Sequence, residues 1–144
     1  MTAPRAIAPS RRLRGEAARR SGRWAEVQAA LLLMATGWRI LGFRLKTPAG
    51  EIDLLAKRGG VLAVVEVKSR TSLDEALGAV TSLQQARLRN AGEGLAARRT
   101  DLQGLAVRLD LIALAPGRRP RHIHDAWGYA GAGRPADVGI VSSP

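Results

Sequence analysis

The feature that most constrains the fold is a Gly59-Gly60 pair between two apolar segments, in the stretch GEIDLLAKRGGVLAVVEVKSR. A two-residue hairpin turn needs positive φ angles, which glycine adopts without a Cβ clash. The segments on either side, residues 51–56 and 61–67, are rich in the branched residues that favour strands. The sequence therefore predicts a β-hairpin with a fixed register.

The register of this hairpin brings four charged side chains to one surface. With the residues beside the turn paired, Asp53 lies opposite Glu66, and Glu51 lies opposite Lys68. Residues two apart on a strand share a face, so the four side chains converge. Opposed β carbons lie about 5 Å apart, and two like charges at that distance repel by about 3 kcal/mol at an effective dielectric constant of roughly 20. Stability alone does not favour this arrangement.

A divalent cation would offset that repulsion, because hard cations such as Mg²⁺ take oxygen ligands. We therefore predict that Asp53 and Glu66 bind Mg²⁺, or Mn²⁺ in its place. Lys68 would then hold a nucleophilic water or offset charge on a phosphoryl oxygen, and Glu51 is a candidate accessory residue. The alternative is a plain surface face of an edge strand with a cross-strand charge network.

Composition predicts one compact domain with a basic surface. The chain has 144 residues, of which 46% are hydrophobic, and a net charge of +11 from 23 Lys and Arg against 12 Asp and Glu. This charge favours a polyanionic partner such as nucleic acid. The absence of cysteine excludes disulfides and thiol catalysis. No apolar run is long enough to span a membrane, so we expect a cytoplasmic protein.

The pattern along the chain predicts an α/β fold. We expect a disordered basic arm at residues 1–20, a folded domain at 21–127 and a flexible tail at 128–144. Within the domain we expect a helix from Ser21 to Gly37, strands at 38–45, 51–56 and 61–67, a helix at 74–99, a strand at 107–114 and an edge piece at 122–127. The order α-β-β-β-α-β predicts a mixed sheet flanked by helices.

Both helices carry an apolar stripe at helical spacing. In the first helix the stripe consists of Trp24, Val27, Leu31 and Met34, which we expect to pack on the sheet. In the second helix Gln84 falls in the middle of the stripe. A polar group there must find partners or face a cleft, so Gln84 is either a satisfied core amide or a contact of the active site.

Two motifs, GEID at residues 50–53 and VEVK at 65–68, resemble the bacterial YraN family of the PD-(D/E)xK nuclease superfamily. The segments between residues 22 and 127 also follow the order of that family. The resemblance implies a restriction endonuclease-like fold that binds DNA and cuts it with Mg²⁺. It also implies that Asp53 and Glu66 are metal ligands, that Lys68 orients the attacking water, and that Glu26 reaches the metal through water.

Several other residues could have a functional or a structural role. Glu26 alone would be an ordinary surface acid, and Asp110 in an apolar strand is expected to pair with Arg108 or another arginine. His122 and His124 lack acidic or cysteine partners at zinc spacing beyond Asp125. The remaining candidates are arginines that either contact phosphates or form a solvated helix face: Arg87, Arg89, Arg98 and Arg99.

The sequence supports three hypotheses about function. The first is a metal-dependent endonuclease that hydrolyses DNA, with branched or structured DNA as a candidate substrate. The second is a non-catalytic nucleic-acid-binding protein that retains the nuclease fold, and the third is a protein bound to structured RNA, since charge does not distinguish RNA from DNA. The resemblance also relates this fold to archaeal Holliday-junction resolvases, which act as two-fold dimers. A homodimer is therefore a further expectation, although the sequence identifies no dimer surface.

Overall fold

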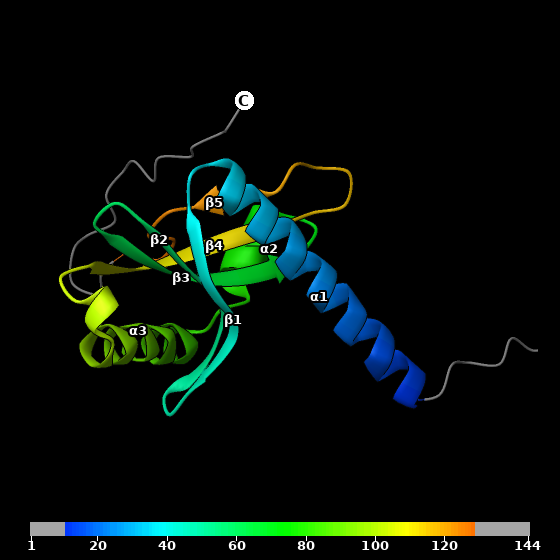
Figure 1. The fold of residues 1–144 in the computed structure, drawn as a ribbon. Coiled ribbons are helices and arrows are strands. Elements are labelled where there is room, and N and C mark those ends of the chain that lie inside the picture. The colour runs from blue at the N-terminus through cyan, green and yellow to red at the C-terminus, as the bar shows by residue number, and fades with distance from the viewer. Residues whose placement is uncertain (1–10, 129–144) are drawn as a thin grey trace, which may run out of the picture.

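The computed structural model describes the backbone of residues 11–128 and the side chains of residues 20–128, which form one mixed sheet with helices on both faces (Figure 1). The sheet has five strands in the order β1-β2-β3-β4-β5. This architecture confirms the predicted α/β class. The elements are α1 Arg11–Ala35, β1 Arg39–Thr47, β2 Gly50–Arg58, β3 Val61–Ser69, α2 Leu73–Gly78, α3 Ser82–Arg98, the 3₁₀ helix η1 Thr100–Leu102, β4 Ala106–Leu114 and β5 Arg121–Ile123.

The hairpin of β2 and β3 has the predicted register. Arg58 pairs with Val61, and the antiparallel pairing continues to Leu54 opposite Val65. Gly59 has a φ of 54°, which explains why glycine is needed at the turn. The segment from β3 to β4 then crosses through α2 and α3, so β4 returns parallel to β3, and β5 closes the sheet antiparallel to β4.

The position of β3 excludes one alternative for the acids. β3 lies between β2 and β4, so Glu66 sits on an interior strand and not on an edge. The side chains before it on β3, from Leu62 to Val65, are fully buried because helices cover both faces of the sheet. α1 packs on the face of Val65, and α3 packs on the face of Val64.

Helix α1 differs from the prediction in its start and in the face that it buries. It begins at Arg11, ten residues before the predicted start. Residues 11–20 of the predicted disordered arm are therefore helical, and residues 1–10 of that arm lie outside the described residues. The predicted packing face is wrong. The side chains against the sheet are mostly small, namely Ala25, Ala29, Ala30 and Leu33, whereas the expected stripe is exposed: Trp24 62%, Val27 42%, Leu31 55% and Met34 53%.

The predicted second helix is interrupted. α2 ends at Gly78 and α3 begins after Thr81, whose hydroxyl accepts a hydrogen bond from the amide of Gln84. The side chain of Gln84 in turn accepts a hydrogen bond from the amide of Thr81 (2.9 Å), which completes a capping box. Gln84 is therefore exposed at the start of α3, and its predicted position in the buried stripe is wrong.

The C-terminal part of the domain contains the expected edge piece. β5 covers three residues, Arg121–Ile123, and the chain then turns at Asp125, which has a φ of 48°. Trp127 anchors the segment, because its indole N–H donates to the carbonyl of Leu77 (3.0 Å). The predicted tail lies outside the described residues from position 129 onward.

Candidate metal site

The candidate site lies where the β2–β3 hairpin pairing ends. The last backbone pair of β2 and β3 is Leu54 with Val65, and Asp53 and Glu66 are the next residue of each strand beyond it. There the Asp53 carboxylate, through Oδ2, accepts a hydrogen bond from the amide of Val67 (3.0 Å). This hydrogen bond holds one oxygen of Asp53 and turns the carboxylate toward β3.

Four of the predicted residues line one pocket of about 300 Å³. Asp53 comes from β2, Glu66 and Lys68 from β3, and Glu26 from α1. The rest of the wall consists of Ser21, Gly22, Ala25, Val67, Ser69 and Arg70. The structure thus brings together the acids and the lysine that the hairpin register predicted, and adds the α1 acid that the family resemblance implied.

Burial and the neighbouring carboxylate both act on Glu66. Its side chain is 14% exposed, and desolvation, followed by the charge of Asp53, raises the pKa of Glu66 from 4.5 to about 7. Lys68 opposes this rise, because its ammonium lies 3.2 Å from Oε1 of Glu66. A carboxylate that resists ionisation in this way favours a cation beside it.

Glu26 has a partner that the sequence did not reveal. Both of its carboxylate oxygens accept hydrogen bonds from Nε of Arg44, at 2.8 and 3.0 Å. Arg44 lies on β1 between the paired positions Phe43–Leu54 and Leu45–Ile52, and therefore opposite Asp53. Its φ of 46° is unusual for a residue other than glycine and indicates local backbone strain.

Several predicted accessory residues lie elsewhere. Glu51 is exposed and pairs with Lys46 of β1, so the expected convergence with Lys68 does not extend to it. The reason is that the pairing of β2 with β3 ends before this position. Gln84 is also outside the pocket wall, since it caps α3.

The candidate nucleic-acid contacts divide into two groups. Arg87 and Arg98 are exposed on α3. Arg99 is bound to Asp101 (2.8 Å), and Arg89 donates to the carbonyl of Gly128. Arg87 and Arg98 are therefore more exposed to solvent than Arg89 and Arg99.

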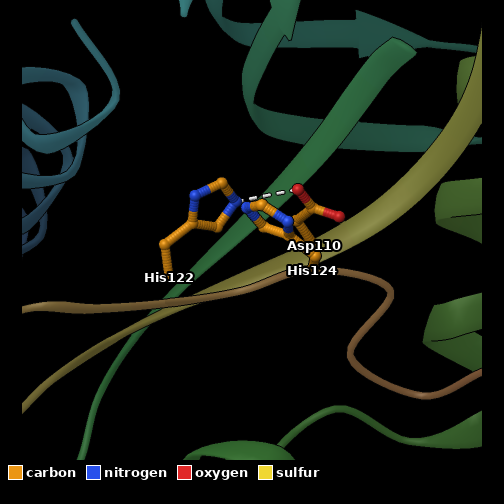
Figure 2. A group of neighbouring side chains, drawn as sticks. All are labelled: Asp110, His122 and His124. Atoms are coloured by element: carbon orange, nitrogen blue, oxygen red, sulfur yellow. Dashed lines mark hydrogen bonds and ion pairs between the residues drawn. The ribbon is translucent and has the colours of Figure 1, made fainter. Parts of the chain in front are cut away.

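A second cluster, Asp110, His122 and His124, lies on the α1 side of β4 and β5 (Figure 2). Its possible ligand atoms all lie within 4.8 Å of one another. The imidazole of His122 points at Asp110, with 2.8 Å between Nε2 and Oδ2. By spacing alone these three side chains could hold a metal ion.

The hydrogen bonds of Asp110 argue for a structural role. Arg108 binds both carboxylate oxygens (2.8 and 2.9 Å), as predicted, and the amide of Asp125 donates to Oδ1 (3.0 Å). Burial opposes the ionisation of Asp110, but the hydrogen bonds of His122 and Arg108 outweigh it and lower its pKa to about 2.

The charges around His124 also oppose a cation. Burial, then His122 and Arg108, lower the pKa of His124. The guanidinium groups of Arg58 and Arg108 both lie over the ring of Trp38, at 5.9 and 5.4 Å from its centroid. These contacts make the cluster part of a buried ion-pair network.

The arrangement of the sheet and the pocket is that of the PD-(D/E)xK class. Proteins of this class have a mixed sheet with an acid pair and a lysine on two neighbouring strands, and a further acid on the preceding helix. The model of the uncharacterised protein family UPF0102 matches residues 25–114, a range that contains Glu26, Asp53, Glu66 and Lys68. The chain therefore belongs to the UPF0102 family, which confirms the resemblance to YraN proteins.

Curated relatives carry the same family name. A UPF0102 protein of Caulobacter sp. (strain K31) is 65% identical over 135 residues, which cover 91% of this chain and 97% of the relative. A UPF0102 protein of Caulobacter vibrioides is 67% identical over 120 residues (83% and 96%), and one of Parvibaculum lavamentivorans is 47% identical over 125 residues (87% and 94%). Among the described residues, no helix is long and apolar enough to cross a membrane.

Proposed function

We propose that this protein is a metal-dependent endonuclease that hydrolyses phosphodiester bonds of DNA. The observation that carries the proposal is the pocket that contains Asp53, Glu66, Lys68 and Glu26 together. Asp53 and Glu66 lie close enough to repel each other, and Glu66 is destabilised as an anion first by burial and then by Asp53.

The donor set fits a hard divalent cation. Asp53 and Glu66 would supply the carboxylate oxygens that Mg²⁺ or Mn²⁺ prefers, and Glu26 would contact the ion through water. When bound, such an ion polarises a phosphoryl oxygen and lowers the pKa of a coordinated water. Four residues of the pocket wall are exposed, so the pocket is reached by solvent: Ser21, Gly22, Ser69 and Arg70.

The residues of the chain would divide the remaining work. The hydrogen bond from Val67 fixes the orientation of Asp53, and the ion pair with Arg44 fixes that of Glu26. Lys68, 21% exposed, points its ammonium into the same pocket and would orient a water or offset the negative charge that develops on the phosphate. The net charge of +11 would attract the nucleic acid.

Cleavage assays test the proposal. The purified protein is incubated with linear and branched DNA and with RNA of matched sequence, in Mg²⁺, Mn²⁺ or EDTA. We expect metal-dependent cleavage of DNA that is lost in Asp53→Ala and Glu66→Ala and retained in Glu93→Ala, a matched control for an exposed acid on α3. Equal cleavage by Asp53→Ala and the parent protein would overturn the site assignment.

A second candidate is a non-catalytic nucleic-acid-binding protein. Two ion pairs favour it, because Lys68 and Arg44 already neutralise Glu66 and Glu26. In that case the protein would bind DNA with the usual salt dependence, but neither metal nor the pocket acids would affect binding. Retention of DNA binding without cleavage, in all variants and with both metals, would favour this candidate.

A further inference from the structure

The outer face of α1 carries an exposed apolar stripe that nothing in the described part of the chain covers. Trp24, Val27, Leu31 and Met34 are all between 42% and 62% exposed. They are four of the six large hydrophobic side chains that are exposed among the described residues. Exposed apolar side chains gathered on one helix face indicate a contact surface.

This face is distinct from the face that packs on the sheet. At 100° per residue, the four exposed side chains centre about 180° away from the buried group Ala25, Ala29 and Leu33. α1 thus has small residues toward its own domain and large residues toward solvent. Glu26 lies on the inner side, so a partner on the outer face leaves the metal pocket open.

The spacing of the stripe is that of a helix–helix seam. The four positions are separated by three, four and three residues, which is the a-d-a-d pattern of two heptads. This spacing reads the same in both directions. In an antiparallel pair of α1 helices related by a two-fold axis, Trp24 of one copy therefore meets Met34 of the other, and Val27 meets Leu31.

The charges beside the seam favour a second copy over a lipid surface. Residues 25–35 contain no Lys or Arg, and Glu26 is their only charged residue, whereas Arg20 and Arg23 stand within about one turn of Trp24. A helix that lies on anionic lipid carries basic residues along the border of its apolar face. Arg20 and Arg23 lie only at the Trp24 end of the stripe, so in an antiparallel pair the repulsion between two chains of charge +11 acts at the ends of the contact and not along it.

We propose that this protein forms a homodimer through an antiparallel α1–α1 contact along Trp24, Val27, Leu31 and Met34. Four half-exposed side chains offer a few hundred Å² per copy, less than the roughly 800 Å² per partner of a standard stable interface. The dimer is therefore weak and depends on concentration. Because salt screens the repulsion between the copies, association strengthens as ionic strength rises, which is opposite to the behaviour of nucleic-acid binding.

Sedimentation velocity on the full chain over a range of concentrations tests the proposal. We expect the wild-type mass to move from one chain toward two, and more so at high salt. Leu31→Glu and Val27→Lys each remain monomeric, because each places an unpaired charge in the seam. Leu83→Glu, at a 60% exposed leucine on α3, is the matched control and behaves as the wild type.

The equimolar mixture of the two seam variants tests the register. Lys at position 27 of one copy would meet Glu at position 31 of the other, so the mixture recovers a dimer that neither variant forms alone. Circular dichroism verifies that each variant is folded. A wild-type protein that stays monomeric at every concentration, or binds anionic vesicles through Trp24 instead, would overturn the proposal, and so would a Leu31→Glu variant that dimerises normally.

Discussion

Replacing Glu66 with glutamine is expected to stabilise the metal-free protein at alkaline pH. The rise in the pKa of Glu66 from 4.5 to about 7 means that the folded state holds this proton more tightly than the unfolded state does. The free energy of unfolding of the wild type therefore falls as pH increases from about 4.5 through 7. At 1.36 kcal/mol per pKa unit, the loss approaches about 3 kcal/mol, with the attraction of Lys68 already included.

Urea unfolding in EDTA at a series of pH values measures this effect. We expect Glu66→Gln to match the wild type near pH 4.5 and to exceed it by up to about 3 kcal/mol above pH 7. Mg²⁺ should then restore stability to the wild type and not to the variant, because only the wild type binds the ion. A variant that is less stable than the wild type at pH 8 without metal would refute the reasoning.

Three further outcomes are expected. Asp110→Ala removes a fully buried carboxylate and leaves the buried His122 and the half-buried Arg108 without it, so it should cost about 3–5 kcal/mol in urea unfolding, yet keep metal binding at the hairpin. In the wild type, the stabilisation from Asp110 should be lost as pH falls from 3.8 toward 2, because its pKa is lowered in the folded state. Gly92→Ala would place a methyl group against Val64 and should lower the free energy of unfolding by about 1–3 kcal/mol. Gly94→Ala on the same helix meets only ordinary contacts and should raise it by about 0.4–1 kcal/mol, and thermal unfolding measures both changes. Lys68→Met should retain metal binding by calorimetry but lose DNA cleavage, because the ammonium is not a ligand.

The hairpin shows what a sequence can specify by itself. The glycine pair allows one turn, the turn fixes the register, and the register places Asp53 beside Glu66. Each step is local, so no tertiary information is needed. The prediction fails at Glu51 because backbone pairing ends after Leu54, where the side chain of Asp53 takes the amide of Val67.

Helix α1 shows what periodicity leaves undetermined. It has apolar residues on two opposite faces, and the pattern alone favours the face with the larger side chains. The sheet instead accepts the alanine face, since small residues let a helix approach closely. A contact outside the chain, of the kind proposed for Leu31, would explain why the larger residues are retained at the surface.

Helical periodicity misplaces Gln84, and no sequence signal identifies Arg44, for different reasons. The Thr81-x-x-Gln84 spacing is a capping-box signal within the sequence, and it competes with the stripe to which Gln84 was assigned. Arg44 carries no comparable signal. Its role depends on the pairing of β1 with β2 and on the position of Glu26 on α1, both of which are tertiary features.

Titration calorimetry with Mn²⁺ on the metal-free protein at pH 8 examines the hairpin pocket without assuming a substrate. The account predicts one binding event for the wild type and for Glu93→Ala, and none for Asp53→Ala or Glu66→Ala. Because Glu66 must lose its proton, the affinity should fall as pH decreases below about 7. Undiminished binding in both pocket variants, or its transfer to a site that is lost in His124→Ala, would contradict the assignment of the metal to Asp53 and Glu66.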